Sequence, residues 1–270
     1  MGSLRRKAPE RLAAPGPFWQ DDRMLAADNP DHCLVTTADG SHTIHLQSLD
    51  EHYHSRHGAA QEARHIFIRH GYEAAQPIVP RRLRLLEMGF GTGLNALLTW
   101  ESATRDALPV SYTTIEAHPL AATLVGRLNH AAQTPAHDAA AVFAALHDCA
   151  WGVPHAFGRN FSFRKWQLRL QDFQPQESFD LLYYDAFSPK AQPELWTRAI
   201  FDKLYSLLAD GGMLLTYCAK GEVKRNLKAA SFSVENLPGP PGKREITRAR
   251  KSCAYGSQWH ERIDEHFPSD

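Results

Sequence analysis

Two periods of hydrophobic spacing alternate along the chain and together predict an α/β fold. Short apolar or alternating runs predict strands at 83–86, 110–115, 161–172, 179–184 and 213–217. Apolar residues at helical spacing predict helices that begin at 94, cover 119–149 with a break near 135, and cover 193–208 and 221–230. Strands at 232–235 and 253–255 would complete a doubly wound, mostly parallel sheet.

The N-terminal third carries a different pattern. Residues 1–30 are rich in Pro, Ala and charge and predict a flexible arm. Two alternating stretches flank Asp39-Gly40, a dipeptide typical of a hairpin turn, and Gln61–Gly71 follows as a helix with Gly71 near its C-cap. We therefore expect a hairpin and helix extension over 31–80, a main domain over 81–256 and a tail over 257–270.

A glycine-rich turn stands between the first core strand and the first core helix. Gly89, Gly91 and Gly93 follow the strand directly, and an apolar helical face begins at Leu94. Glycine adopts positive φ and lets a ligand lie against the backbone, so strand, turn and helix predict a nucleoside-cofactor cradle. A dinucleotide fingerprint would place its third glycine one residue later than Gly93.

Acidic residues stand at or near the ends of successive predicted strands. Glu116 lies where nucleotide folds hydrogen-bond the ribose hydroxyls, and a solvated carboxylate is the alternative. Asp172 could accept the adenine amine, although a surface aspartate is nearly as good an interpretation. With Glu87 directly before it, the compact Gly89-x-Gly91-x-Gly93 form resembles the first motif of S-adenosylmethionine-dependent methyltransferases. Together with Glu116, Asp172 and Asp185, this resemblance implies a class I, Rossmann-like methyltransferase fold. The expected cofactor-binding residues are Glu87, Gly89, Gly91, Gly93, Asn95, Glu116, Asp172 and Asp185.

Composition narrows the class of protein but does not identify a binding partner. The 270 residues contain 43% hydrophobic and 22% charged residues, with neither a membrane-length apolar run nor an apolar leader, so we expect a cytoplasmic protein. Lys plus Arg and Asp plus Glu number 30 each, so global charge does not favour nucleic acid. The four cysteines are widely spaced, and His52, His54 and His57 lack a second ligand pair. We predict no metal site, and we interpret the histidine segment as a polar helix that lines a cleft.

The stretch from Asp185 to Pro189 resembles the short polar-aromatic motif that class I methyltransferases acting on nitrogen keep at this place, so the resemblance implies methyl transfer to nitrogen. An alkylamine has a pKa of about 10.4, so an enzyme must bind the ammonium and release its proton. A carboxylate at Asp185 could attract and orient that group. Phe187 could make a cation–π contact beside it or act as a wedge under the loop.

Four segments extend this interpretation by resemblance: DGSHTIHLQSLDEHYHSRHGAAQEARHIFI, LEMGFGTGLNAL, FDLLYYDAFSPKAQPELWT and GKREITRARK. In this order they resemble the methyltransferases that form 5-methylaminomethyl-2-thiouridine in tRNA, namely the stand-alone MnmD proteins and the methyltransferase half of MnmC. The Asp-x-Phe-x-Pro…Pro-x-x-Trp pattern from Asp185 to Trp196 is the most specific part. The resemblance implies methylation of the exocyclic amine of 5-aminomethyluridine at the wobble position, uridine 34, with Asp185 and Phe187 as catalytic residues.

Two residues depart from the family pattern, and the chain ends early. Ala186 and Ser231 stand where relatives often have glycine, at the substrate loop and at a turn. Because the chain ends at Asp270, we expect no flavin-binding half, so another enzyme would make the aminomethyl group.

A tRNA substrate requires a phosphate-binding face, and local basic clusters could supply it. The candidates are Lys220, Lys224, Arg225 and Lys228 on one helix, Lys243, Arg244, Arg248, Arg250 and Lys251 in the following segment, and a third cluster of Arg81, Arg82 and Arg84.

Two alternatives to a tRNA methyltransferase stay open. A polyamine aminopropyltransferase would share the sheet and the glycine loop but usually carries a second acidic residue after the fourth strand. A non-catalytic RNA-binding or scaffold protein would not need the intact acidic set.

Overall fold

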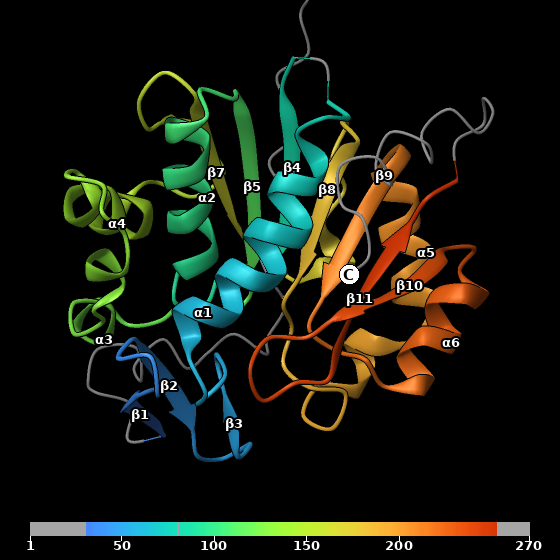
Figure 1. The fold of residues 1–270 in the computed structure, drawn as a ribbon, viewed down its shortest axis with the longest axis horizontal. Helices are drawn as coiled ribbons and strands as arrows, with labels where there is room; N and C mark the ends of the chain where they lie inside the picture. Colours follow the sequence, from blue (N-terminus) through green and yellow to red (C-terminus); the bar gives the residue numbers. More distant parts are fainter. Residues whose placement is uncertain (1–30, 80, 253–270) are drawn as a thin grey trace, which may run out of the picture.

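An eight-stranded sheet forms the centre of the molecule in a computed structural model that describes residues 31–79 and 81–252 (Figure 1). The strand order is β10-β11-β9-β8-β4-β5-β7-β6. The central strands β4, β5, β7, β8 and β9 are parallel, whereas β11, β10 and β6 pair antiparallel with their neighbours. The bounds of these strands are Leu83–Met88 (β4), Val110–Glu116 (β5), His155–Ala156 (β6), Phe161–Gln167 (β7), Phe179–Tyr184 (β8), Leu208–Thr216 (β9), Ser233–Pro238 (β10) and Glu245–Arg250 (β11). This mostly parallel sheet confirms the predicted fold class.

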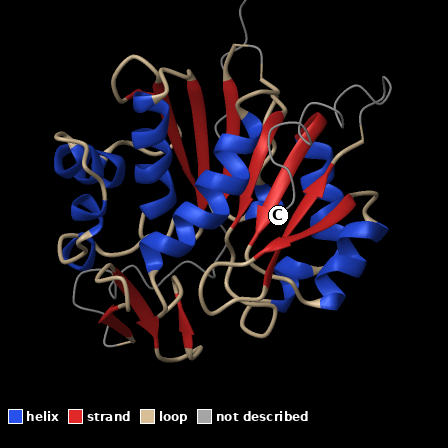
Figure 2. Ribbon diagram, in the orientation of Figure 1, coloured by secondary structure: helices blue, strands red, loops and turns tan. Residues whose placement is uncertain are grey.

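Helices cover both faces of the sheet (Figure 2). Strand β4 shows why: Leu83 and Leu85 pack into the core that contains helix α2, whereas Leu86 packs into the core that contains helices α5 and α6. A strand buried on both faces is mainly apolar, and in this strand Leu83, Leu85 and Leu86 are fully buried. The helical segments are Ala59–Ala63 (α1), Arg64–Glu73 (η1, a π-helix), Leu94–Arg105 (α2), Ala122–Val125 (α3), His130–Gln133 (η2), Ala139–Asp148 (α4), Leu170–Asp172 (η3), Pro193–Trp196 (η4), Arg198–Leu207 (α5) and Gly221–Ala229 (α6).

The N-terminal extension forms a separate three-stranded sheet at one end of the central sheet (Figure 1). Its strands are His32–Thr36 (β1), His42–Leu46 (β2) and Glu51–His52 (β3), so the predicted hairpin is confirmed and gains a short third strand.

The hairpin turn also begins the first helix. The Ser41 hydroxyl oxygen accepts hydrogen bonds from the backbone N–H groups of Ala59 and Ala60, both at 3.1 Å, and the Asp39 carboxylate accepts one from Gln61 at 2.9 Å. The first N–H groups of a helix have no partner inside it. The turn therefore supplies the cap that the sequence around Gly58 lacks.

Several element boundaries were predicted wrongly. The helix expected at 61–71 runs from Ala59 to Glu73, and Gly71 lies inside it rather than at its end. A Cβ at Gly71 would lie 2.9 Å from the Tyr183 ring, so close packing on the sheet explains this glycine. The region 119–149 is helical with the predicted break near 135, which lies between Gln133 and Ala139, but its first half forms two short helices instead of one. The helix expected at 193–208 is two helices, η4 and α5, separated at Thr197, whose hydroxyl accepts a hydrogen bond from the Ile200 N–H.

The C-terminal strands also differ from the prediction. The fifth strand begins at Leu208 rather than 213, and the sixth covers Ser233–Pro238 rather than 232–235. Strand β11 fills the position between them, whereas the strand expected at 253–255 lies outside the described residues. Across 31–79 and 81–252, every helix is too short or too polar to cross a lipid bilayer.

Candidate functional site

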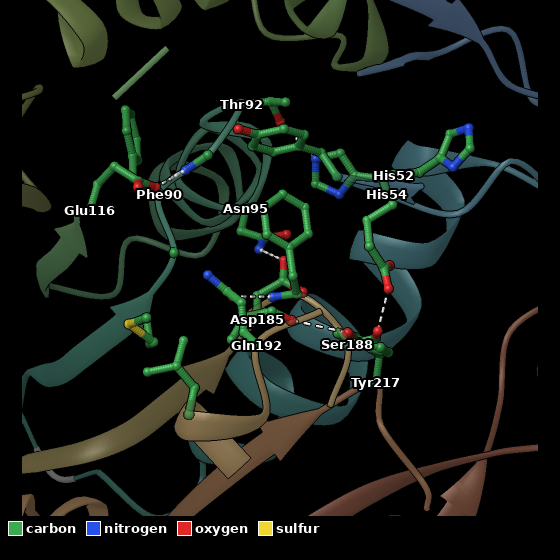
Figure 3. Close-up of a pocket in the computed structure, with 18 of the residues that line it drawn as sticks. His52, His54, Phe90, Thr92, Asn95, Glu116, Asp185, Ser188, Gln192 and Tyr217 are labelled. Carbon is green, nitrogen blue, oxygen red and sulfur yellow. Dashed lines mark hydrogen bonds between the residues drawn. The ribbon is translucent and has the colours of Figure 1, made fainter. Parts of the chain in front are cut away.

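A pocket of about 670 Å³ opens at the carboxyl ends of β4, β5 and β8. Parallel α/β sheets bind ligands at this edge, where the loops after neighbouring strands diverge. The glycine loop, the loops after β5 and β8, and residues 50–57 of the N-terminal extension line the pocket. The close-up in Figure 3 shows the side chains of Asn95, Glu116 and Asp185 around it.

The glycine loop needs glycine because of its backbone and its neighbours. Gly89 and Gly91 have φ values of +92° and +50°. A Cβ at Gly89 would lie 2.8 Å from the Asp185 carbonyl oxygen, and one at Gly91 would lie 3.0 Å from the Tyr53 ring. A side chain at either position would therefore close the pocket or push the loops apart.

Glu116 closes strand β5 and lines the pocket. Its carboxylate accepts hydrogen bonds from the backbone N–H groups of Gly91, at 2.9 Å, and His118, at 2.8 Å. These two donors fix the carboxylate and leave further acceptor capacity on each oxygen. A carboxylate held in this way suits a ligand with two adjacent hydroxyl groups.

Asp185 follows strand β8 and faces the pocket from the opposite side. The Asn95 side-chain amide donates a hydrogen bond of 2.9 Å to its carboxylate (Figure 3). Burial raises the pKa of Asp185 to about 7, although the Asn95 hydrogen bond acts in the opposite direction. A carboxyl group with such a pKa can hold or release a proton near neutral pH.

Glu87 does not line the pocket, although the sequence predicted it to be among the residues that contact the cofactor. Its side chain is fully buried beneath the glycine loop, where it accepts a hydrogen bond of 2.8 Å from the Thr114 hydroxyl. Burial raises the pKa of Glu87 to about 8. The acidic residue before the glycines thus supports the site from below.

The spacing from Asp185 to Trp196 has a structural explanation. Trp196 is buried, and its indole N–H donates a hydrogen bond of 2.8 Å to the Phe187 carbonyl, while the Phe187 N–H donates one of 3.0 Å to the Gln192 side chain. The Phe187 ring contacts the Tyr53 ring edge-on, with the centroids 4.9 Å apart. These contacts hold residues 186–192 as a rigid rim of the pocket.

Asp172 does not lie where the sequence predicted. Strand β7 ends at Gln167, and Asp172 lies in the helical turn η3, with 67% of its side chain exposed and its carboxylate 4.0 Å from the Arg169 guanidinium. The turn directs Leu170 and Gln171 to the pocket instead. We therefore omit Asp172 from the residues proposed to bind a cofactor.

Acidic neighbours pair with part of the predicted basic surface. The Lys224 ammonium lies 2.8 Å from Glu245, and the Lys243 ammonium lies 3.0 Å from Glu62 and 4.1 Å from the centre of the Tyr217 ring. Lys220, Arg225 and Arg244 are exposed. Arg84, at the amino end of β4, pairs with Asp180, so the third predicted cluster lies at the edge of the sheet away from the pocket.

Sequence reasoning missed several residues that line the pocket. Tyr53 and Tyr217 contribute aromatic surface, and the Ser188 hydroxyl donates a hydrogen bond to Glu51 of the extension. His54 lines the pocket as expected, but from a loop rather than a helix, and its ring lies 2.6 Å from the Thr92 hydroxyl. These contacts cross between distant segments, so no local spacing could have revealed them.

Comparison with known proteins shows what this chain is similar to. A family described as S-adenosyl-L-methionine-dependent methyltransferase matches residues 164–252. The tRNA 5-methylaminomethyl-2-thiouridine biosynthesis bifunctional protein MnmC of Aromatoleum aromaticum is 32% identical over 229 residues, which cover 80% of this chain and 35% of that protein. The chain spans about a third of the length of the MnmC relatives it matches.

Solved structures support the fold alone. The crystal structure of MNMC2 from Aquifex aeolicus superposes with a TM-score of 0.67 at 22% identity, covering 87% of this chain and 76% of that one. The spermidine synthase of Thermotoga maritima superposes with a TM-score of 0.51 at 11% identity, covering 88% of this chain and 75% of that one. Since both share the sheet, the fold does not separate methyl transfer from aminopropyl transfer.

Proposed function

Because the chain matches S-adenosyl-L-methionine-dependent methyltransferases over residues 164–252 and resembles MnmC proteins over about 80% of its length, we propose that it methylates the aminomethyl nitrogen of 5-aminomethyluridine in tRNA. The observation that carries the proposal is Asp185, a carboxylate held by Asn95 at the wall of a pocket that also contains the glycine loop. The proposed position is uridine 34 of the anticodon. The substrate would have to carry its aminomethyl group beforehand.

The described residues fit S-adenosylmethionine. The glycine loop leaves room that a Cβ would fill, Glu116 offers acceptors for the ribose hydroxyls, and Leu170 and Gln171 border the same pocket. When bound, the cofactor supplies an electrophilic methyl group on a sulfonium. Asn95 and Asp185 stand at the end of the pocket nearest the loop after β8, which suits the reacting end of the cofactor.

Asp185 would act on the acceptor amine. An alkylammonium has no free lone pair, so its proton must leave before nitrogen can form a bond to carbon. Asp185 can attract the ammonium as a carboxylate and hold the released proton, because burial raises its pKa to about 7. Phe187, Tyr53 and Tyr217 border the same region and would exclude water from the amine. Alignment of the nitrogen with the methyl group would supply much of the acceleration.

The proposed partner is the anticodon loop of tRNA. Single-stranded bases are recognised when they leave their stack and enter a protein pocket. Lys220 precedes helix α6 just beyond the carboxyl end of β9, at the edge of the sheet where the pocket opens. Together with Arg225 and Arg244, it would contact phosphates while uridine 34 reaches Asp185.

Incubation with methyl-labelled S-adenosylmethionine and tRNA from a strain that lacks the modification tests this function. We expect label in 5-methylaminomethyluridine after nuclease digestion, and none with tRNA whose uridine lacks the aminomethyl group. A parallel incubation with decarboxylated S-adenosylmethionine and a diamine tests aminopropyl transfer. Product in that reaction, or no label on tRNA, would overturn the proposal.

A further inference from the structure

Two buried oxygen atoms beneath the glycine loop lack hydrogen-bond donors. They are Oε1 of Glu87 and Oδ1 of Asn95, and within the described residues neither has a partner. Glu87 is fully buried, and only 3% of Asn95 is exposed. Unpaired buried acceptors are costly, so native structures rarely leave two of them next to each other. The Asn95 side chain lies within interaction range of Glu87. So does the Tyr112 hydroxyl, which also has no partner among the described residues and can donate to Glu87 whether or not Glu87 is protonated.

The remaining atoms of both side chains are already committed. Oε2 of Glu87 accepts a hydrogen bond from the Thr114 hydroxyl, and the Asn95 amide nitrogen donates to Asp185. Both carboxyl groups therefore converge on one amide. If both carboxyl groups were ionised, the Asn95 amide nitrogen could donate a hydrogen bond to each of them. The amide oxygen of Asn95 would then receive no hydrogen bond from either carboxylate, because both are acceptors. A single proton on one carboxyl group resolves the conflict.

We propose that Glu87 carries this proton and donates it to the Asn95 amide oxygen, which fixes the amide nitrogen on Asp185. Glu87 is thus a positioning residue that acts through Asn95, and this inference rests on the proposed function of Asp185. Access to water explains why Glu87, and not Asp185, holds the proton. Asp185 faces the pocket and can be solvated as a carboxylate, whereas Glu87 is fully buried and has no access to water.

The groups around Glu87 also favour a proton on Glu87 over one on Asp185. Among the described residues, the titratable groups that act on Glu87 are Tyr112 of β5, Tyr183 of β8 and Asp185. None of these groups carries a positive charge that would favour an ionised carboxylate. Burial is the main cause that raises the pKa of Glu87 to about 8, and the Asp185 charge acts in the same direction. Hydrogen bonds from Thr114, Tyr112 and Asn95 lower this pKa, but burial outweighs them.

Infrared spectroscopy of the free protein tests the proton directly, without any substrate. The wild type at neutral pH should show the carbonyl band of a protonated carboxylic acid, and Glu87→Gln should remove the larger part of it. The remainder comes from Asp185, whose pKa is about 7, and should disappear in the double variant Glu87→Gln/Asp185→Asn. Glu177→Gln changes an exposed carboxyl group and should leave the band in place. A band that Glu87→Gln leaves unchanged, or no band in the wild type, would overturn the proposal even if tRNA is confirmed as substrate.

Kinetics then test the positioning role. Gln can donate to Asn95 and accept from Thr114, so Glu87→Gln should keep kcat near the wild-type value, whereas Glu87→Met should lose roughly tenfold or more. The ratio of kcat for Glu87→Gln to kcat for the wild type should rise as pH increases through about 8, because only the wild type loses its donor. Because both enzymes use the same amine, its ionisation cancels in the ratio. A ratio independent of pH would overturn the positioning role.

If the wild type transfers no methyl group to tRNA, the proposed function fails, and the infrared result still decides where the proton lies.

Discussion

The side-chain amide of Asn95 donates a hydrogen bond of 2.9 Å to the carboxylate of Asp185. Asn95 belongs to the first turn of α2, directly after the glycine loop, whereas Asp185 follows β8. One contact therefore joins the predicted cofactor cradle to the predicted acceptor side. The two halves of the site cannot move apart without breaking it.

Replacement of Asp185 should abolish turnover and spare cofactor binding. Without the carboxylate, the acceptor ammonium loses its partner, and we expect kcat to fall roughly 100-fold or more in Asp185→Ala. The Kd for S-adenosylhomocysteine, measured by calorimetry, should change only a few-fold because Glu116 and the glycine loop are retained. Asp210→Ala, at the opposite edge of the sheet, serves as the control. Full activity in Asp185→Ala would remove Asp185 from its assigned role.

Glu116 and Asp172 should differ sharply in their effect on cofactor affinity. Glu116→Gln exchanges an acceptor carboxylate for an amide that can offer only one acceptor oxygen to Gly91, His118 and the ribose. Since hydrogen bonds to charged groups contribute roughly 1.5–3 kcal/mol, the Kd for S-adenosylhomocysteine should rise about tenfold or more. Asp172→Asn should leave it unchanged because that side chain is exposed outside the pocket. Equal effects of the two substitutions would contradict this assignment.

Periodicity and spacing predicted the features that depend on neighbouring residues. The strand, glycine turn and helix from Leu83 onward, and the acidic residue that closes β5, follow from short-range rules and are found as predicted. Asp172 was misplaced because the alternating pattern continues past Gln167, while the chain turns into η3. No local pattern indicates that turn.

Contacts between distant segments could not be predicted from the sequence. Tyr53 meets Phe187 across the pocket, and Lys243 pairs with Glu62, although each pair is separated by more than a hundred residues. The basic clusters show the same limit. Their charges were evident from the sequence, but their acidic partners became evident only in the fold.

The Asp39 carboxylate should add to the free energy of unfolding, and this contribution should be lost at acidic pH. Its carboxylate accepts from Thr37, Ser41 and the Gln61 N–H, and loss of a helix cap costs about 1–2 kcal/mol, so Asp39→Ala should be destabilised by about that amount in urea unfolding. Burial alone would raise the pKa of Asp39, but these hydrogen bonds lower it below its usual 3.8.

Because the folded-state pKa is the lower one, the increment is present above the unfolded-state pKa and disappears as pH falls through the folded-state value. The stability difference between wild type and Asp39→Ala should therefore shrink below about pH 4. A difference that stays constant from pH 6 to pH 3 would show that Asp39 stabilises without its charge.

Replacement of Ser231 by glycine should stabilise the protein. It has a φ of +72° and follows α6, where its N–H donates to the Lys228 carbonyl and the next N–H, from Phe232, donates to the Leu227 carbonyl. This is the Schellman arrangement, whose left-handed residue is usually glycine. Ser231→Gly should therefore stabilise the protein by about 0.5–1 kcal/mol in urea unfolding.

Ser206→Gly is the matched control for Ser231→Gly. Ser206 lies within helix α5, where glycine costs conformational entropy, so this substitution should destabilise by roughly 0.5 kcal/mol. Destabilisation by both substitutions would mean that the Ser231 side chain makes a contribution that outweighs the backbone strain.

Binding of tRNA should depend on salt through a small set of exposed cations. Lys220, Arg225 and Arg244 are exposed, whereas Lys224 and Lys243 already pair with Glu245 and Glu62. Each phosphate contact releases counterions and contributes about 0.7–0.9 to the slope of log affinity against log salt. Replacing the three exposed residues by Ala should weaken binding and lower that slope by up to about 2–3.

Lys228→Ala provides the control for charge alone. Lys228 lies in the last turn of α6, at the other end of the helix from Lys220, and is equally exposed. We expect its removal to change affinity and slope little, as measured by filter binding across a salt series. The phosphate-binding face would have to lie elsewhere if Lys228→Ala matched the triple variant, or if affinity did not respond to salt at all. In either case Asp185 could still receive the uridine, because the pocket does not depend on these side chains.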